Sequence, residues 1–192
     1  MLILLRHGRT TANRDGLLQG RVDNPLDEYG QQQAETAAAY LHHSTPRGID
    51  RVIASPLTRA QQTAAALRMA VETEDRLVEI DYGEWEEKPV AEVSPQTWAT
   101  WRADPDFRPP GGETLMELGA RVREAVSEIA EQAEKTNIVV VSHVSPMKAM
   151  VAWALGVSDE ATWRMYIAQA SICRIEMRGG TPVLAALNEH AL

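Results

Sequence analysis

The chain of 192 residues contains a single cysteine, Cys173. No internal disulfide can therefore form, which excludes a secreted fold held together by disulfides. No apolar run approaches the roughly 20 residues that cross a bilayer. The apolar residues 2–5 follow no basic segment and lead directly into Arg6 and His7, so we interpret them as a strand and not as a signal peptide. We expect a cytoplasmic protein.

A surplus of positive charge is also absent. The chain has 19 lysine and arginine residues against 27 aspartate and glutamate residues, a formal net charge of −8. This balance argues against a broad surface for nucleic acid, which requires clustered cations. We therefore expect neither a nucleic-acid partner nor a membrane partner. A local cationic pocket is still compatible with this composition.

Short apolar runs alternate with segments of helical character. Hydrophobic residues make up 44% and charged residues 24%, as in ordinary globular proteins, and the length suits one domain. Unbroken apolar runs are typical of strands covered on both faces. We expect strands at 2–5, 51–54, 137–141, 171–177 and 183–187, one of the last two being antiparallel. This alternation predicts an α/β fold, a three-layer sandwich with a mostly parallel central sheet and helices on both faces.

Capping signals indicate where several helices begin. Asp27 is a suitable N-cap for a helix over 27–41. Ser55-Pro56 combines an N-cap serine with proline at the first helical position, and Ser145-Pro146 repeats that signature before residues 147–155. Apolar residues at spacings of three and four predict one buried stripe along a helix at 113–134.

Residues 85–112 differ from the rest of the chain. They contain five prolines and three tryptophans. We interpret them as an insertion that lies over the sheet and contains a short helix at about 95–103. The prediction is thus a single domain over residues 1–192 with an insertion at about 85–112.

Three predicted strands end in polar residues that suit a phosphate group. Arg6 and His7 follow the first strand, and His143 follows the third. Ser55 ends the second, with Arg59 one helical turn further on. Ligands of open α/β sheets bind beyond the carboxyl ends of the strands, so we expect these side chains to converge there.

The residue types at these strand ends fit phosphoryl chemistry. A guanidinium binds phosphate oxygens with a planar fork, and helix N-termini add N–H donors. An imidazole that is neutral near pH 7 can attack phosphorus with one nitrogen. Nearby arginine charges favour this neutral form.

A series of short motifs extends this pattern along nearly the whole chain. They are Leu5-Arg6-His7-Gly8 with Thr10 and Asn13; Gln19-Gly20, Asp23, Pro25-Leu26 and Gly30; Ser55-Pro56-Leu57 with Arg59-Ala60 and Gln62-Thr63; Leu77, Glu79, Gly83 and Trp85-Glu86; Pro110-Gly111-Gly112-Glu113; and Val141-Ser142-His143. In this order they resemble the histidine phosphatase superfamily, also called the phosphoglycerate mutase-like family. Within it, the chain is most similar to the alpha-ribazole phosphatase-like and acid phosphatase branch.

The resemblance implies a role for each matching residue. His7 would be the nucleophile that becomes phosphohistidine, and Glu79 would protonate the leaving oxygen. A proton donor must carry its proton when substrate binds, so we expect activity to favour mildly acidic pH. The remaining catalytic residues would be Arg6, Arg59 and His143, which hold the phosphoryl oxygens, with further phosphate contacts from Asn13, Gln19 and Gly20. The scheme requires no cofactor and no metal ion.

The expected activity is hydrolysis of a small phosphorylated metabolite, a phosphomonoester. Two alternatives stay open: a phosphoglycerate-type mutase that uses the same phosphohistidine, and a non-catalytic module that binds a phosphorylated ligand. A mutase must exclude water with an extensive lid and tail, and by resemblance the block at 79–88 fits the phosphatase branch better. The natural substrate stays open, as do the choice between monomer and homodimer and membership of a longer fusion protein.

Several positions depart from the family pattern or have two interpretations. Arg9 stands where glutamate is frequent, and either adds positive charge near the pocket or lies in an exposed loop. Ser145 and Lys148 either reach the substrate or serve as a helix cap and a solvated charge. We expect substrate specificity to lie in residues 85–112 and 10–24.

Overall fold

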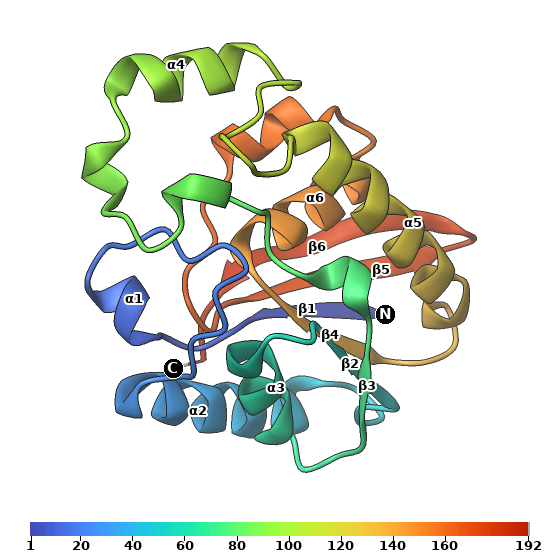
Figure 1. Ribbon diagram of the computed structural model, residues 1–192. Helices are drawn as coiled ribbons and strands as arrows, with labels where there is room; N and C mark the ends of the chain where they lie inside the picture. Colours follow the sequence, from blue (N-terminus) through green and yellow to red (C-terminus); the bar gives the residue numbers. More distant parts are fainter. Residues whose placement is uncertain (192) are drawn as a thin grey trace.

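A sheet of six strands lies between helices on both of its sides (Figure 1). The computed structural model describes residues 1–191. The strands are β1 (Leu2–Arg6), β2 (Arg51–Ala54), β3 (Val71–Thr73), β4 (Ile138–Ser142), β5 (Ile172–Arg178) and β6 (Thr181–Glu189). Their order in the sheet is β3-β2-β4-β1-β5-β6.

The directions of the strands confirm the expected sheet. The neighbours β3, β2, β4 and β1 are parallel, whereas β5 is antiparallel to both β1 and β6. Strand β3 was not predicted, because two of its three residues are exposed and it lacks an apolar run. It forms a short edge of the sheet, next to the buried strand β2.

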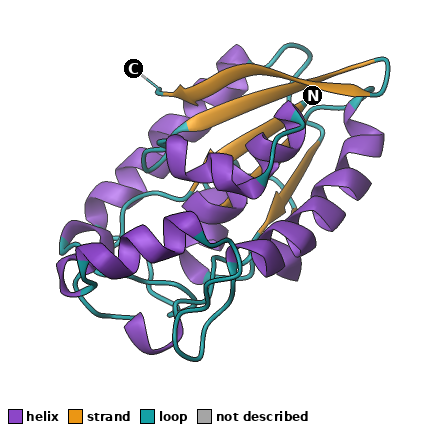
Figure 2. Ribbon diagram, turned by 90° about the horizontal axis from the view of Figure 1, so that it is seen from above, coloured by secondary structure: helices purple, strands orange, loops and turns teal. Residues whose placement is uncertain are grey.

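Two pairs of helices cover the two faces of the sheet. The helices are α1 (Thr11–Arg14), α2 (Glu28–Ser44), α3 (Thr58–Ala65), α4 (Pro95–Ala103), α5 (Leu115–Ala133) and α6 (Val144–Leu155). Leu2 and Leu4 pack with α5 and α6, whereas Ile3 and Leu5 pack with α2 and α3. Successive residues of a strand face opposite sides, so an unbroken apolar run results from coverage on both faces. The α/β sandwich is thus confirmed, and both helical layers are visible in Figures 1 and 2.

Two predicted helix starts are wrong. Helix α3 begins at Thr58, so Ser55 and the proline after it precede the helix and do not cap it. Helix α6 begins at Val144, which places Ser145 inside its first turn. Ser55 and Ser145 each have another hydrogen-bond partner, as described below. The predicted cap Asp27 is confirmed, since its side chain accepts the Gly30 N–H at 2.7 Å.

Residues 85–112 leave the sheet, pass through α4 and return to α5 (Figure 1). The expected helix at 95–103 is confirmed as α4, which Ser94 caps. Its Trp98 and Trp101 stack with ring centroids 5.6 Å apart, and Trp101 is buried in the core cluster that also contains side chains of α5 and α6. Within residues 1–191, no helix combines the length and the apolar character needed to cross a membrane.

Candidate active site

Two histidines lie side by side at the carboxyl end of the sheet. The parallel register of β1 and β4 pairs the last residue of each, Arg6 with Ser142. The next residues, His7 and His143, are therefore neighbours, with ring centroids 5.1 Å apart and planes tilted by 56°. Both side chains are buried, at 2% and 0% exposure. The strand ends thus bring together residues that are more than a hundred positions apart in the chain.

The first imidazole is fixed in one tautomer. Its Nδ1 lies 2.7 Å from the carbonyl oxygen of Gly8. A carbonyl only accepts hydrogen bonds, so Nδ1 carries the proton and Nε2 keeps its lone pair. Burial, together with the charges of Arg6 and Arg59, lowers the pKa of His7 well below its usual value. His7 is therefore a neutral base with a free Nε2.

The second imidazole has one satisfied nitrogen and one free nitrogen. The Nε2 of His143 lies 2.7 Å from the Ser55 hydroxyl at the end of β2. The same hydroxyl lies two residues before Leu57, the N-cap of α3. The Nδ1 of His143 is buried and has no partner within residues 1–191. Burial and then Arg59 lower the pKa of His143 well below its usual value.

Two guanidinium groups flank the histidines and are held by carbonyl oxygens. Arg6 donates to the carbonyl of Ile167 at 2.6 Å. Arg59, only 1% exposed, donates to the carbonyls of Val22 at 2.8 Å and Gly20 at 2.7 Å. Carbonyls fix the two groups without neutralising them, and the Nε atoms of both are buried without a partner in the described part of the chain. Two positive charges thus stay available to an anion.

A carboxylate completes the group of candidate residues. Glu79 is 5% exposed, and its Oε1 accepts the N–H of Ile80 at 2.8 Å and of Ser145 at 3.2 Å. The second bond uses an N–H from the first turn of α6. Glu79 therefore has one orientation, fixed by backbone donors from two segments.

Arg121 fixes the backbone that carries Glu79. From α5, it donates to the carbonyls of Val78 at 2.8 Å and Glu79 at 3.1 Å. The guanidinium is itself paired with Glu113 at 2.7 Å. Sequence reasoning missed Arg121, which stands in no motif. The only sequence signal for Arg121 was its partner Glu113. This residue ends the Pro-Gly-Gly-Glu motif and had no assigned role.

The loop over residues 10–24 is organised around Thr10. The Thr10 hydroxyl donates to the side-chain oxygen of Gln19 at 2.8 Å, and its N–H donates to Asn13 at 3.2 Å in the capping box of α1. The carbonyl of Gly20 binds Arg59, as described above. These contacts shape the loop and support Arg59. Direct phosphate contacts from Asn13, Gln19 and Gly20 stay predictions.

Arg9 takes part in a structural contact with the start of α2. Its Nε donates to Asp27 at 2.8 Å, and its guanidinium lies over the ring of Tyr29, 4.5 Å from the centroid. It therefore joins the first loop to the start of α2. The N–H of Ser145 binds Glu79, and Lys148 lines a cavity beside that carboxylate.

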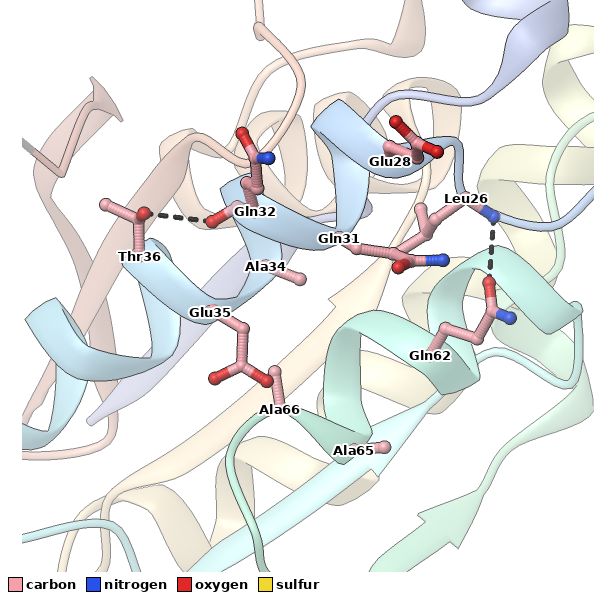
Figure 3. Close-up of a pocket in the computed structure, with 10 residues that line it drawn as sticks. All are labelled: Leu26, Glu28, Gln31, Gln32, Ala34, Glu35, Thr36, Gln62, Ala65 and Ala66. Atoms are coloured by element: carbon pink, nitrogen blue, oxygen red, sulfur yellow. Dashed lines mark hydrogen bonds between the residues drawn. The ribbon is translucent and has the colours of Figure 1, made fainter.

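A wide hollow on another part of the surface does not coincide with these residues. It measures about 830 Å³ and lies between α2 and α3 (Figure 3). Its charged lining residues are Glu28 and Glu35, which repel anions, and it contains no histidine or arginine. Its chemistry does not suit phosphate, so we assign the site to the strand ends. Among residues 1–191, no three His, Cys, Asp or Glu side chains are grouped to hold a metal ion.

Comparisons with known proteins agree with this geometry. The family model "Histidine phosphatase superfamily (branch 1)" matches residues 2–190. A bifunctional protein of Mycobacterium tuberculosis is 36% identical over 178 residues, 89% of this chain and 48% of that protein, so the chain spans about half the length of its mycobacterial relatives. Phosphoserine phosphatase 1 of Hydrogenobacter thermophilus is 34% identical over 97% of this chain and 91% of that protein.

A solved structure shows the same likeness in three dimensions. The alpha-ribazole phosphatase of Shigella flexneri has a TM-score of 0.86 at 28% identity, covering 100% of this chain and 97% of that chain. Sequence and structure therefore agree over almost the full length. The chain belongs to the histidine phosphatase superfamily, branch 1.

Proposed function

We propose that this chain hydrolyses a small phosphomonoester through a phosphohistidine on His7. One observation carries the proposal. Beside the free Nε2 of His7, three buried nitrogens lack a partner within residues 1–191: Nε of Arg6, Nε of Arg59 and Nδ1 of His143. A buried donor without an acceptor costs about 1–3 kcal/mol, and phosphoryl oxygens would supply acceptors. The phosphatases among the relatives support the same reaction class.

The first half-reaction transfers the phosphoryl group to the protein. Nε2 of His7 forms a bond to phosphorus while the bond from phosphorus to the alcohol oxygen breaks. Glu79 donates its proton to that oxygen, so the leaving group departs as a neutral alcohol. Negative charge on the equatorial oxygens is stabilised by the guanidinium groups and His143.

The second half-reaction restores the site. Water attacks the phosphorus, the bond to Nε2 breaks, and Glu79, now a carboxylate, accepts the proton from the water. Inorganic phosphate is released. No step of this scheme requires a metal ion or a cofactor.

The test compares the wild-type protein with His7→Asn on an aryl phosphate such as p-nitrophenyl phosphate. We expect His7→Asn to lower kcat/KM by about a thousandfold or more, since loss of a nucleophile removes the whole pathway. Rapid acid quench with labelled substrate should show acid-labile phosphorus in the wild type and none in the variant. His43→Asn, at an exposed position, is the matched control.

Other results would select other functions. Equal rates for wild type and His7→Asn would exclude the proposed nucleophile. No turnover by either protein, with phosphate binding in calorimetry, would indicate a binding module. Transfer to a second hydroxyl without release of inorganic phosphate, followed by phosphorus NMR, would indicate a mutase.

A further inference from the structure

Residues 19–22 form a tight turn that holds the guanidinium of Arg59. The N–H of Val22 closes the turn on the carbonyl of Gln19 at 3.0 Å. Gly20 has a φ of 53°, in the left-handed region that favours glycine. The carbonyls of Gly20 and Val22 accept from Arg59 at 2.7 and 2.8 Å. The geometry of this turn therefore decides where the guanidinium lies.

A side chain from another segment binds the middle of the turn. Arg21 lies between Gly20 and Val22, and the bond that closes the turn leaves the Arg21 N–H free. This N–H donates to Oε1 of Glu86 at 2.6 Å. The carboxylate lies directly against the turn, since a Cβ added to Gly20 would collide with the same oxygen. One oxygen of Glu86 thus fixes the turn between the two carbonyls that hold the guanidinium.

Backbone hydrogen bonds hold Glu86 beside the turn. The N–H of Glu87 donates to the carbonyl of Leu18 at 2.7 Å, and the N–H of Leu18 donates to the carbonyl of Lys88 at 2.9 Å. The two segments lie side by side in Figure 1. A shorter side chain at position 86 leaves both of these bonds in place. Such a substitution therefore removes the contact with the turn and preserves the pairing of the segments.

The half-buried carboxylate of Glu86 binds backbone groups and not a cation. Besides the Arg21 N–H it accepts the N–H of Tyr82, at 3.4 Å. The guanidinium of Arg21 pairs instead with Asp81 at 3.5 Å and with Glu113 at 3.4 Å. An uncharged oxygen at position 86 could accept the same N–H groups. The contact therefore depends on an acceptor oxygen and not on a negative charge.

We propose that Glu86 is a positioning residue for phosphate binding, which acts on Arg59 through the turn and does not touch the substrate. The inference rests on the proposed function, in which Arg59 binds phosphoryl oxygens. Both terminal nitrogens of Arg59 donate to the turn, and its Nε is buried without a partner within residues 1–191. A displaced turn would move this guanidinium and weaken its charge-assisted bond to the phosphoryl group.

Calorimetry with inorganic phosphate tests the proposal without requiring turnover. Glu86→Ala removes the acceptor and should weaken phosphate binding by about five- to tenfold. Glu86→Gln keeps an oxygen acceptor for the Arg21 N–H, so its phosphate affinity should stay within about twofold of the wild type. Glu84→Ala, at an exposed position two residues away, is the control and should bind phosphate like the wild type.

A double-mutant cycle tests whether the effect passes through Arg59. Arg59→Lys keeps a positive charge in the pocket but lacks the planar fork that spans the two carbonyls. Glu86→Ala added to Arg59→Lys should lower phosphate affinity by less than about twofold, because the turn no longer positions the cation. The losses from the two substitutions should therefore not add.

The opposing outcomes separate this proposal from the proposed function. Equal losses from Glu86→Ala with arginine and with lysine at position 59 would refute the role of Glu86, because general damage to the fold would explain them. Glu86→Gln binding as weakly as Glu86→Ala would also refute it. A wild type that binds phosphate but hydrolyses no phosphomonoester would refute the proposed function alone, and the cycle would still decide the role of Glu86. A wild type that binds no phosphate would refute both.

Discussion

At the scale of single residues, the site depends on side chains held in one state by backbone groups. Glu79 accepts two backbone N–H groups, and His7 donates to the carbonyl of Gly8. Such contacts fix rotamer and tautomer before any substrate arrives.

Glu79→Gln tests the proposed proton donor through its dependence on the leaving group. An alkoxide leaves poorly without a proton, whereas p-nitrophenolate leaves easily. We expect kcat/KM to fall by about a hundredfold or more for an alkyl phosphate and by much less for p-nitrophenyl phosphate. Because kcat/KM depends only on the steps up to phosphoryl transfer to His7, the later attack by water does not affect the comparison.

Glu84→Gln, at an exposed neighbouring position, is the control for that variant and should behave like the wild type. An equal loss on both substrates would mean that Glu79 supports the fold of the site and does not protonate the leaving oxygen.

The positions of the strand-end residues were predictable from the sequence. The contacts of α5 and α6 with residues 76–82 were not. Parallel strands end at the same sheet edge, so the approach of His7 to His143 follows from their positions after apolar runs. The contacts of Arg121 and Lys148 depend on how α5 and α6 pack against residues 76–82. No spacing in the sequence encodes that packing, and both residues look like ordinary surface charges of a helix.

At the scale of elements, the loop after β1 and the start of α2 approach each other closely. A Cβ on Gly30 would lie 1.9 Å from the carbonyl oxygen of Arg9, and a Cβ on Gly8 would lie 2.3 Å from the carbonyl oxygen of Gly30. Both obstacles are backbone atoms, which cannot rotate away. The loop that carries His7 therefore depends on two glycines.

Gly30→Ala should destabilise the protein by about 1–3 kcal/mol, because the added methyl group forces the two backbones apart. The free energy of unfolding in urea measures this effect. Gln31→Ala, at the exposed next position of α2, is the control and should change stability little. A Gly30→Ala protein as stable as the wild type would show that the loop adjusts without cost.

Helices and strands with a complete apolar pattern were predictable, whereas their starts were less so. The serine-proline signature misplaced the starts of α3 and α6. Helix α3 begins three residues after Ser55, whose hydroxyl contacts His143, and α6 begins one residue before Ser145, whose N–H binds Glu79. Both errors fall at the site. There, the needs of a ligand pocket override local capping preferences.

At the scale of the whole molecule, two buried neutral histidines link stability to pH. The pKa values of His7 and His143 are lowered by burial, so the unfolded chain takes up protons on them before the folded protein does. Stability is therefore lost as pH falls below about 6.5, the usual pKa of histidine. The loss amounts to about 1.4 kcal/mol per pH unit for each histidine until its folded pKa is reached.

Urea unfolding of the wild type and His7→Asn at pH 7.5, 6.5 and 5.5 checks this linkage. The variant should lose less stability between pH 6.5 and 5.5, by about 1 kcal/mol, because the unfolded histidine is only half protonated at the start of this interval. Carboxylates titrate alike in both proteins and cancel in the comparison. Identical pH dependence would mean that His7 protonates in the folded state as readily as in the unfolded chain.

The architecture as a whole was predictable because both faces of the sheet are covered. Coverage on both faces makes strands continuously apolar and separates them by helices, and this pattern is readable without coordinates. In the edge strand β3, only one of the three side chains is partly buried, so its sequence shows no apolar pattern. The cluster of positive charge at the strand ends could be predicted only in part, since the net charge of the chain is −8.

Arg59 donates hydrogen bonds to the carbonyls of Gly20 and Val22. During evolution, a change in the sequence of this loop therefore also changes the anion pocket. An insertion or deletion there would swing the guanidinium even if every reactive side chain were retained. Relatives with altered loops at this point should therefore differ in their affinity for phosphate, and not only in which alcohol they release.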